Sequence, residues 1–501
     1  MSKVSLAVLL QGFASNLPDI SVSGLSLDSR QIQSGFMFVA LQGTRQHGLE
    51  HAQSVIEAGA SVIVHDHVAP PAVVETLKSA TIPVVSITGL AQHLGEIAKR
   101  FYQANQQAEA RVIGVTGTDG KTSTTHFIAE ALHAAQQQAA VIGTLGIGQP
   151  GKLHKGTHTT PDAIQVQQHL AQLAQAGFET VAMEVSSHAL DQGRVNAVNF
   201  EMAVLTNLTR DHLDYHGTVA AYADAKRKLF QWPSLKHAVL NLDDAFGQEL
   251  AQQLQARQVQ VWGYGLGERA NYPTNGVIAT EARFDHNGIW AKIVTLAGEG
   301  ILQAPVLGKF NLHNLLAALS VLLAYGLDLP QALKALQQVY TVPGRMERVT
   351  ASTMKDVLVA VDYAHTPGAL SQVLNAARVH TRGKLICVFG CGGDRDAGKR
   401  PLMAGIAEQQ ADQVIVTDDN PRTESAQQIF QDIRAGFKNA QAVTFEHDRA
   451  KAIRMAVKAA QEGDTILIAG KGHETVQLIA GEQIPFDDRE QAALALEECA
   501  A

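Results

Sequence analysis

One glycine-rich stretch of the chain combines residue types suited to binding phosphate. The segment GVTGTDGKTSTT lies between an apolar run and a helical pattern, and Gly117 and Gly120 let its backbone curl so that amides face an anion. Lys121 would reach the β- and γ-phosphates of a nucleotide, and the Thr122 hydroxyl would ligate Mg²⁺. The usual phosphate-loop pattern has a glycine where this chain has Val115. We therefore predict a shorter variant of a nucleotide-binding loop, with a chance strand-loop-helix match as the alternative.

Two polar segments follow the next predicted strands. VAMEVSSHALDQGRV ends a strand in Glu184, and LTNLTRDHLDYHGT adds Asp211, His212 and His216 after another strand. Sheets of the α/β class place ligand-binding groups at the carboxyl ends of their strands. Thr122, Glu184 and His212 would together surround two magnesium ions, whereas a histidine in such a loop, taken alone, is more often structural.

Two other charged stretches are ambiguous when each is taken alone. In YADAKRKLF, Lys226 and Lys228 predict a solvated helix face. In VTDDNPRTE, from Val416 to Glu424, two acids, an Asn-Pro pair and one arginine follow an apolar run. This pattern predicts either a strand that ends in a turn with solvated charges or an arginine held there for a ligand.

The elements that must position these residues alternate, from Ala110 onward, between short apolar runs and longer helical patterns. ARVIGVTG leads into a helix from about Lys121, and TVAMEV, MAVLTNL and HAVLNLDD predict further strands. A helix is expected from Leu312 to Tyr325, ending near Gly326. A second cycle has KLICVFG, DQVIVTD and DTILIAG as strands, with helical segments such as ESAQQIFQDIRAGF between them. Two sheets of the nucleotide-binding type are implied.

The first hundred residues have a different pattern, with FMFVAL, ASVIVHD and IPVVSI as short strands around a helix near His51 to Ala58. A chain of 501 residues is too long for one ordinary core, so roughly three domains are expected. We place them at residues 1–92, 93–342 and 343–501, with QANQQAEA as a candidate linker. The predicted fold class is α/β in three domains: a small N-terminal α/β domain, a central parallel-sheet domain of the phosphate-loop type and a C-terminal Rossmann-like domain.

Composition excludes several classes of protein. Hydrophobic residues make up 46% and charged residues 18% of the chain, as in soluble globular domains. The net charge of −8 argues against a nucleic-acid-binding protein, which needs a basic face. Three unpaired cysteines predict a reducing compartment without disulfides, and we expect a cytoplasmic protein. The longest apolar stretch, LLAALSVLLAYGL, is shorter than the ~20 residues of a membrane span, so a buried helix is expected and membrane insertion is not.

Seven motifs, in chain order, resemble those of the Mur ligases of bacterial cell-wall synthesis: GVTGTDGKT, EVSSHAL, NLTRDHLDYHG, AYADAKRKLF, GKFNLHN, VPGRMERV and VDYAHTP. The match spans nearly the whole chain and is far more specific than the phosphate loop alone. It is closest to the members that add the third peptide residue. The resemblance implies an ATP-dependent amide ligase that joins meso-2,6-diaminopimelate to UDP-MurNAc-L-Ala-D-Glu through an acyl phosphate, in a pathway that supports cell shape and cell division.

The resemblance also implies substrate contacts. LSLDSR matches the uridine segment, and GTRQHG resembles the adjacent nucleotide loop but departs from its usual pattern. The expected contacts of UDP-MurNAc-dipeptide are Leu27, Ser29, Thr44, Arg45, Gln46, Thr159, Thr160, Ser186, Gln192 and Arg194. Asp119 stands where an Asn is common in the family, which puts a negative charge near the phosphates. The expected ATP contacts are Gly117, Thr118, Asp119, Gly120, Lys121, Thr122, Ser123, Asn314, Arg345 and Asp362.

In this family the lysine that matches Lys226 is carbamylated by CO₂, and the adduct replaces a cation by an anion that can support Mg²⁺. The expected metal ligands are Thr122, Glu184, His212 and Lys226, and the expected catalytic residues are Lys121, Glu184, His212 and Lys226.

The DNPR tetrapeptide resembles the motif by which the family selects diaminopimelate, where lysine-adding relatives carry a different tetrapeptide. Diaminopimelate keeps a carboxylate and an amine at its unreacted end, and a guanidinium such as that of Arg422 offers the carboxylate two parallel hydrogen bonds. The expected contacts are Arg395, Asp419, Asn420, Pro421, Arg422, Gly470 and Glu474.

Two rival functions explain part of the sequence. A folylpolyglutamate synthetase shares the ligase architecture and the phosphate loop, but it has no need of a UDP-binding domain. A phosphate-loop switch or motor protein explains Lys121 and Thr122 but not the C-terminal motifs. For the ligase, the expected cofactors are ATP, two Mg²⁺ and CO₂ as the carbamate, the partners are UDP-MurNAc-L-Ala-D-Glu and meso-diaminopimelate, and a monomer is expected.

Overall fold

The structure is a computed structural model that describes residues 3–43, 46–66, 77, 80–104, 109–156, 158–268, 275–349 and 357–499. The chain packs into two compact units, which we describe separately. The first unit comprises Met1–Thr125, Gln136–Leu240 and Asp244–Val261, and the second comprises His126–Ala135, Asn241–Asp243 and Trp262–Ala501. This division cuts across the expected central domain, so the boundaries near residues 92 and 343 remain a prediction.

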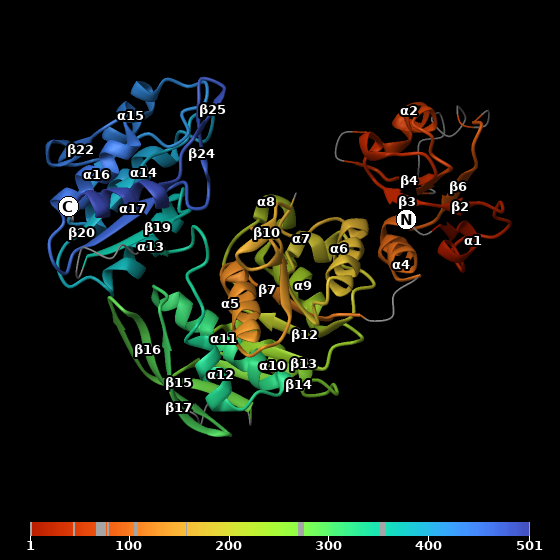
Figure 1. The fold of residues 1–501 in the computed structure, drawn as a ribbon, viewed down its shortest axis with the longest axis horizontal. Helices are drawn as coiled ribbons and strands as arrows, with labels where there is room; N and C mark the ends of the chain where they lie inside the picture. Colours follow the sequence, from red (N-terminus) through yellow and green to blue (C-terminus); the bar gives the residue numbers. More distant parts are fainter. Residues whose placement is uncertain are drawn as a thin grey trace. The chain divides into compact units, whose positions relative to one another are not determined.

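A small parallel sheet occupies the N-terminal part of the first unit (Figure 1). Its order is β3-β4-β5-β6, and the three strands expected from sequence are β4, β5 and β6, so that prediction is confirmed. The strands are β3 (Gly24–Ser26), β4 (Phe36–Ala40), β5 (Val62–Asp66) and β6 (Val84–Ile87). The other elements here are β1 (Val4–Ser5), α1 (Leu6–Leu9), β2 (Ser21–Val22), the 3-10 turns η1 (Ser29–Gln31) and η2 (Gly48–His51), α2 (Ala52–Glu57) and α4 (Leu90–Gln103).

The first unit also contains a second parallel sheet, whose strand order is β8-β11-β7-β12-β13. Because β11 and β12 flank β7 in parallel register, the carboxyl ends of these three strands meet at one edge of the sheet. The strands are β7 (Arg111–Thr116), β8 (Ala139–Gly143), β11 (Thr180–Glu184), β12 (Phe200–Leu205) and β13 (His237–Asn241), with β9 (Gly146–Gln149) and β10 (Lys152–His154) added antiparallel beyond β8. The helices are α5 (Lys121–Ala134), α6 (Ala163–Gln175), α7 (Ser187–Asp191), α8 (Leu213–His216), α9 (Val219–Phe230) and α10 (Ala245–Leu254).

The second unit contains an antiparallel region and a buried helix. The predicted apolar helix forms α11 (Lys309–Tyr325), which starts three residues earlier than expected and ends at Gly326, a left-handed residue with φ 110°. The strands β15, β16 and β17 form an antiparallel meander that we did not predict. The elements are β14 (Gln260–Leu266), β15 (Asn275–Asp285), β16 (Gly288–Thr295), β17 (Gly298–Ala304) and α12 (Leu329–Leu336).

The rest of the second unit is a doubly wound sheet with the order β18-β19-β23-β20-β21-β22, parallel except for β18. Alternate residues of its strands face opposite layers: Leu385 and Cys387 pack with α13, α14 and α15, whereas Ile386 and Val388 pack with α16 and α17. The strands are β18 (Glu347–Val349), β19 (Leu358–Asp362), β20 (Leu385–Phe389), β21 (Gln413–Val416), β22 (Thr444–Phe445) and β23 (Thr465–Ala469). The helices are α13 (Pro367–Arg378), α14 (Lys399–Gln410), α15 (Ala426–Arg434), α16 (Arg449–Ala459) and α17 (Asp488–Glu498), and a hairpin is formed by β24 (Val476–Ile479) and β25 (Glu482–Pro485).

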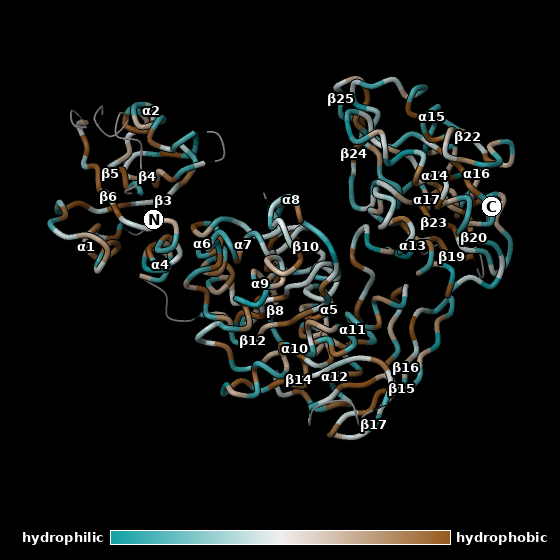
Figure 2. Tube along the Cα trace, turned by 180° about the vertical axis from the view of Figure 1, so that it is seen from behind, coloured by the Kyte–Doolittle hydropathy of each residue, from teal (hydrophilic) through white to brown (hydrophobic). Residues whose placement is uncertain are grey.

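The hydrophobic segments follow this architecture, since brown stretches in Figure 2 run along the buried strands and helices. The structure therefore confirms the predicted α/β class, with two parallel sheets of the nucleotide-binding type and a smaller N-terminal sheet. Across the described ranges, which omit residues such as 67–76 and 350–356, no helix is long and apolar enough to cross a membrane.

The part of α5 that belongs to the second unit carries two buried titratable side chains. Glu130 accepts a hydrogen bond from the backbone N–H of Tyr340 (2.9 Å), in the segment that leads to β18. Burial raises the pKa of Glu130 to about 7 and lowers the pKa of His126 to about 4. The two groups lie one helical turn apart, with 4.0 Å between His126 Nδ1 and Glu130 Oε1.

Candidate active site

The predicted phosphate loop follows β7 and is supported by the end of β12. Gly117 has φ 151°, and a Cβ there would lie 1.8 Å from Thr206 Oγ1, so no other residue fits at this position. The Asn207 carbonyl accepts from the Thr118 N–H (3.0 Å) and the Asn207 side chain accepts from the Asp119 N–H (2.9 Å). Thr206 Oγ1 donates to the Asp119 carbonyl (2.6 Å). The neighbouring strand thus fixes the curl of the loop.

Two lysines converge on one carbonyl of this loop. Lys121 Nζ donates to the carbonyls of Gly117 (2.9 Å) and Thr118 (2.8 Å), and Lys226 Nζ, from α9, donates to the same Gly117 carbonyl (2.7 Å). Lys226 is 1% exposed and its Nζ lies 4.4 Å from the Tyr222 ring centroid. The solvated-face interpretation is therefore wrong for Lys226, whereas Lys228 is exposed and pairs with Asp191.

The environment of Lys226 disfavours a charged amine. Burial lowers the pKa of Lys226 far below its ordinary value, and the nearby Lys121 ammonium lowers it further. An uncharged amine is the form of lysine that reacts with an electrophile such as CO₂.

Two oxygen donors meet at the end of β11. Thr122 Oγ1 donates to Glu184 Oε2 (2.9 Å), and Glu184 is 1% exposed. The other carboxylate oxygen, Oε1, accepts from the Thr144 N–H (2.8 Å). A hydroxyl and a carboxylate are ligands of the type Mg²⁺ prefers, so this pair fits the expected metal.

The side chain of His212 is 46% exposed. Its ring centroid is 5.0 Å from that of His188 and 6.0 Å from that of Tyr222, which also contacts Lys226. In the described ranges, which exclude residue 157, no three His, Cys, Asp or Glu side chains are placed to hold a metal ion. Thr122 and Glu184 are hydrogen-bonded to each other, Lys226 contacts the loop, and His212 is linked to Lys226 through the Tyr222 ring. Metal binding by all four remains a prediction.

The expected dipeptide contacts form a network next to Glu184. Thr160 Oγ1 donates to the Glu184 carbonyl (2.9 Å), and the backbone carbonyl of Thr160 accepts from Arg194 (3.1 Å). Arg194 also donates from two nitrogens to Gln192 Oε1 (2.8 and 2.6 Å), while Ser186 caps α7 by accepting from the Ala189 N–H. Thr159 joins the group through its hydroxyl, 3.0 Å from that of Thr144.

The expected uridine contacts lie in the N-terminal part of the first unit. Leu27 is half-buried against the core there, and Ser29 starts the 3-10 turn η1, which Asp28 caps by accepting from the Arg30 N–H (3.0 Å). Gln46 Nε2 lies 2.6 Å from His51 Nε2. Thr44 and Arg45 lie outside the described residues.

The remaining ATP contacts belong to the second unit. Asn314, on α11, is buried and donates to the Asn311 side chain (2.9 Å). Asp362, at the end of β19, accepts from the backbone N–H groups of Met346 (2.7 Å) and Ala364 (2.8 Å), and burial raises its pKa to about 6. The guanidinium carbon of Arg345 lies 5.6 Å from the Tyr363 ring centroid, and Arg345 adds an attraction that opposes the rise in the pKa of Asp362.

The residues expected to bind diaminopimelate gather at the carboxyl ends of β20, β21 and β23. Asn420 donates to Glu474 (2.9 Å), and a Cβ on Gly470 would lie 3.4 Å from Asp419 Oδ2. The two arginines border one glycine, because a Cβ on Gly392 would lie 2.8 Å from Arg422 Nη1 and 3.9 Å from Arg395 Cγ. The structure thus brings all members of this set into one region, with Pro421 inside the turn.

Sequence reasoning missed a buried lysine in this region. Lys471 is fully buried and its Nζ donates to Asn420 Oδ1 (3.0 Å), Glu474 Oε2 (3.1 Å) and the Val476 carbonyl (2.6 Å). It therefore orients two expected contacts. Its place between two glycines in AGKGHE was the only sequence signal, and that pattern is equally typical of a solvated turn.

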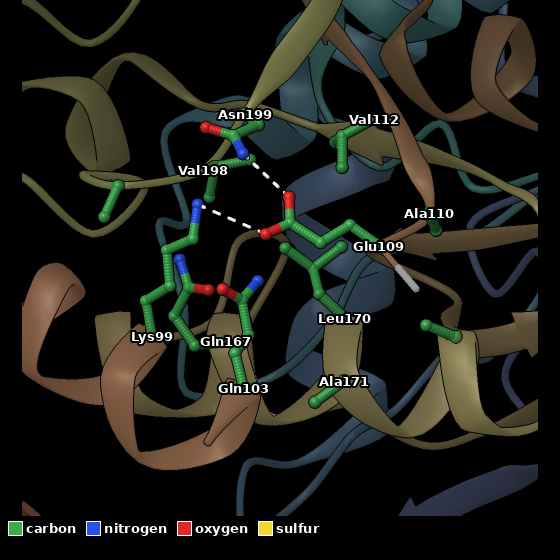
Figure 3. Close-up of a pocket in the computed structure, with 12 residues that line it drawn as sticks. Lys99, Gln103, Glu109, Ala110, Val112, Gln167, Leu170, Ala171, Val198 and Asn199 are labelled. Carbon is green, nitrogen blue, oxygen red and sulfur yellow. Dashed lines mark hydrogen bonds and ion pairs between the residues drawn. The ribbon is translucent and has the colours of Figure 1, made fainter. Parts of the chain in front are cut away.

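Two cavities of the first unit lie apart from these residues. One cavity has a volume of about 20 Å³ and is lined by α4, α6 and residues 109–112 and 197–199. Its lining residues are drawn in Figure 3, where Glu109 pairs with Lys99 (3.6 Å) and accepts from Asn199 (2.7 Å). A more open pocket of about 660 Å³ lies between residues 14–18 and 83–86. None of the expected site residues lines either one, and the smaller holds no more than a water molecule.

Comparison with known proteins agrees with the motifs. Residues 21–102 match the Mur ligase family catalytic domain, residues 115–322 the Mur ligase middle domain, and residues 344–472 the Mur ligase glutamate ligase domain. UDP-N-acetylmuramoyl-L-alanyl-D-glutamate--2,6-diaminopimelate ligases from Ectopseudomonas mendocina and Pseudomonas aeruginosa are each 48% identical, over 95% of this chain and 95% and 96% of theirs. A solved structure of a ligase with that name is 37% identical and covers all of both chains, with a TM-score of 0.76. With three matched domains and relatives this similar along nearly its whole length, the chain belongs to the Mur ligase family.

Proposed function

We propose that the protein is an ATP-dependent ligase that joins meso-2,6-diaminopimelate to UDP-MurNAc-L-Ala-D-Glu in peptidoglycan precursor synthesis. The observation that carries the proposal is the pairing, in one region, of two arginines bordering Gly392 with a polar set that includes Asn420 and Glu474. The two guanidinium groups can donate charge-assisted hydrogen bonds to the distal carboxylate of diaminopimelate, and the Glu474 carboxylate can accept them from its distal ammonium. The names of relatives at 48% identity support the same substrates.

The reaction has two steps. The D-glutamyl carboxylate attacks the γ-phosphorus of ATP, forming a C–O–P linkage as the bond to ADP breaks. The amine of diaminopimelate then attacks the acyl carbon, forming the amide and releasing phosphate and a proton. Lys121 offsets the repulsion between the anionic reactants of the first step, and the loop amides cradle the phosphates. Arg194, held by Gln192 and Thr160, positions the dipeptide.

The residues around the loop suit the magnesium that Mur ligases require. Thr122 and Glu184 would hold it, joined by His212 and the modified Lys226 as a second site. When bound, Mg²⁺ supplies positive charge that neutralises the phosphates.

We also propose that Lys226 carries a carbamate. Lys226 is 1% exposed, and its amine donates to the phosphate loop and lies beside Lys121. A cation there is disfavoured, while an anion would find a cationic partner. Formation of the N–C bond to CO₂ releases one proton from the amine and leaves a carboxylate-like group.

Further parts of the proposal rest on the family resemblance. We place the protein in the cytoplasm, as a monomer with domains at 1–92, 93–342 and 343–501. The N-terminal match at residues 21–102 favours a UDP-sugar ligase over a folylpolyglutamate synthetase, which has no need of that domain.

A screen of third amino acids with UDP-MurNAc-dipeptide held fixed tests the function. We expect phosphate release only when ATP, UDP-MurNAc-dipeptide and meso-diaminopimelate are all present, and lysine should be a poor substitute. ATP turnover without an amino acid substrate would favour a switch or motor protein, and turnover with a folate instead of the UDP-sugar would favour the synthetase.

A further inference from the structure

An ion cluster built on one buried arginine lies next to the turn expected to bind the amino acid substrate, and its two acids are partly exposed. Arg400, near the start of α14, is 1% exposed and donates to both carboxylate oxygens of Glu424 (2.7 Å each). It also donates to Asp432 on α15 (2.6 Å) and to the Gly392 carbonyl (3.3 Å). Glu424 closes the stretch VTDDNPRTE, two residues beyond Arg422.

Glu424 connects this cluster to the other arginine-bearing loop. Its Oε2 accepts from the Asp394 N–H (2.9 Å), one residue before Arg395. Asp394 Oδ2 in turn accepts from the N–H (3.0 Å) and the hydroxyl (2.8 Å) of Thr423. The loop after β20 and the loop after β21 are thus hydrogen-bonded to each other at residues next to Arg395 and Arg422.

The backbones of the two loops are in close contact. The Gly393 N–H donates to the Asn420 carbonyl (2.9 Å), and Arg422 Nη1 donates to the Gly393 carbonyl (2.8 Å). A Cβ on Gly393 would lie 1.9 Å from the Pro421 carbonyl oxygen, so a larger residue would push the loops apart. The separation of Arg395 from Arg422 thus depends on this contact.

Both loops hold a non-glycine residue in the left-handed region. Asp394 has φ 54° and Arg422 has φ 57°. This conformation is disfavoured for residues with a Cβ and persists where surrounding contacts fix it. For Arg422 these contacts are its N–H to the Leu478 carbonyl (2.9 Å) and its carbonyl to the Ala480 N–H (2.7 Å) on the β24–β25 hairpin. For Asp394 they are the bonds to Glu424 and Thr423.

We propose that the Arg400–Glu424 ion pair sets the spacing of Arg395 and Arg422, which makes Glu424 a specificity-determining positioning residue for an amino acid with a distal carboxylate. This inference rests on the proposed function. Glu424 acts through the two loops and does not touch the substrate. The guanidinium of Arg400 holds the pKa of Glu424 down at about 2. The Arg400–Glu424 ion pair, which we call the brace, therefore stays ionised throughout the pH range of an assay.

Asp432 offers a matched control. It shares the Arg400 guanidinium with Glu424, and its other carboxylate oxygen accepts from Gln428 on its own helix (2.9 Å). Removing Asp432 takes the same charge from Arg400 but leaves the bond between Glu424 and Asp394. A merely structural role of the cluster would make the two acids equivalent.

The test compares Glu424→Ala, Glu424→Gln and Asp432→Ala in the full-length enzyme. We expect Glu424→Ala to raise KM for diaminopimelate about tenfold or more, to reduce the preference for diaminopimelate over lysine, and to leave KM for ATP within about twofold. Glu424→Gln, which keeps an acceptor for Asp394, should recover part of the loss. Asp432→Ala should leave KM for diaminopimelate within about twofold, although its Tm falls as much as that of Glu424→Ala.

Two results would overturn the brace: an unchanged KM for diaminopimelate in Glu424→Ala, or an equal rise in both alanine variants. Failure of the proposed function has a different signature, because the wild type would then ignore diaminopimelate. In that case KM of the same variants is measured for the amino acid that the wild type uses. Equal KM values for Glu424→Ala and Asp432→Ala would again reject the brace.

Discussion

The phosphate loop and the amino acid loops hold their ligand-binding groups by different means. Around Gly117 the partners are backbone groups and the side chains of Thr206 and Asn207, all within one sheet edge. Around Arg422 the partners are backbone groups of the loop that follows β20 and of the β24–β25 hairpin, and the buried Arg400 of α14 adds an ion pair to Glu424, two residues beyond Arg422. The first arrangement suits a phosphate, which every nucleotide presents in the same way, whereas the second suits discrimination between amino acids that differ by one charge.

The largest expected effect concerns Lys226. This lysine is buried beside the phosphate loop, whose other partners are backbone groups and uncharged side chains. Lys226→Ala should lower kcat for ligation by roughly 10³-fold or more, because the anion proposed to support Mg²⁺ is lost. Steady-state ligation assays check this, and formate or acetate should restore part of the activity.

Lys228→Ala is the matched control for that variant, since Lys228 lies on the same helix but is exposed and pairs with Asp191. Its activity should stay close to that of the wild type. Full activity of Lys226→Ala without additives would refute the carbamate.

Lys121→Ala separates nucleotide chemistry from binding of the UDP-sugar. We expect loss of ATP-dependent turnover by roughly 10²-fold or more, because the ammonium that offsets phosphate charge is removed. Calorimetry should show the Kd for UDP-MurNAc-dipeptide within about twofold of the wild type, since Leu27 and Ser29 follow β3 of a separate sheet. An equal loss of turnover and of UDP-sugar affinity would contradict the domain assignment.

Arg422→Ala addresses the amino acid side of the comparison. Hydrogen bonds to charged groups contribute roughly 1.5–3 kcal/mol, so kcat/KM for diaminopimelate should fall about ten- to a hundredfold. Lysine should remain a poor substrate because Arg395 is still present. Measurements with both amino acids decide the point, and undiminished use of diaminopimelate would show that Arg422 is only the polar end of a turn.

The last expected effect is on stability instead of activity and concerns Glu130 in α5. Its pKa is raised by burial to about 7 from an ordinary 4.5, so the folded state gains from its proton below pH 4.5 and loses that gain as pH rises to 7. Glu130→Gln keeps an acceptor for the Tyr340 N–H and removes the titration. Relative to the wild type, the variant should gain up to about 3 kcal/mol between pH 4.5 and 7.

Thermal unfolding of wild type and variant at pH 5 and pH 7.5 measures this difference. His126, whose pKa is lowered to about 4, titrates in the opposite sense and stabilises the fold as pH rises. Because the lowered pKa keeps folded His126 largely uncharged at both pH 5 and pH 7.5, its contribution to the difference between the two proteins is small. A gap in Tm that is the same at the two pH values would exclude Glu130 as the titrating group.

Local sequence patterns predicted the parallel sheets and the phosphate loop, because strand, glycine turn and helix follow one another in the chain. The β15–β16 hairpin was missed, although His286 and Asn287 before Gly288 are the kind of residues found in a tight turn. The brace was missed for another reason. Arg400 and Glu424 are 24 residues apart in the sequence, and nothing in either segment indicates that their side chains meet.

The same physical distinction applies within the site. Asn420 and Glu474 were expected near one ligand because the family motifs imply it. Their direct hydrogen bond and the contact of Glu474 with Lys471 depend on how the segments after β21 and β23 meet, which no local pattern shows. Burial of Lys226 was also invisible in its segment, where alternating charges are typical of an exposed helix.

The close approach of Gly393 to Pro421 has a consequence for protein engineering. A four-residue graft that replaced DNPR by the tetrapeptide of a lysine-adding relative would place a new turn against an unaltered loop, with no space for adjustment at Gly393. The exchangeable module is therefore larger than the tetrapeptide: it comprises residues 391–396 and 419–424 together with Arg400. Libraries intended to change the amino acid incorporated by such an enzyme should vary these positions jointly, because single-loop libraries would sample mostly misfitted combinations.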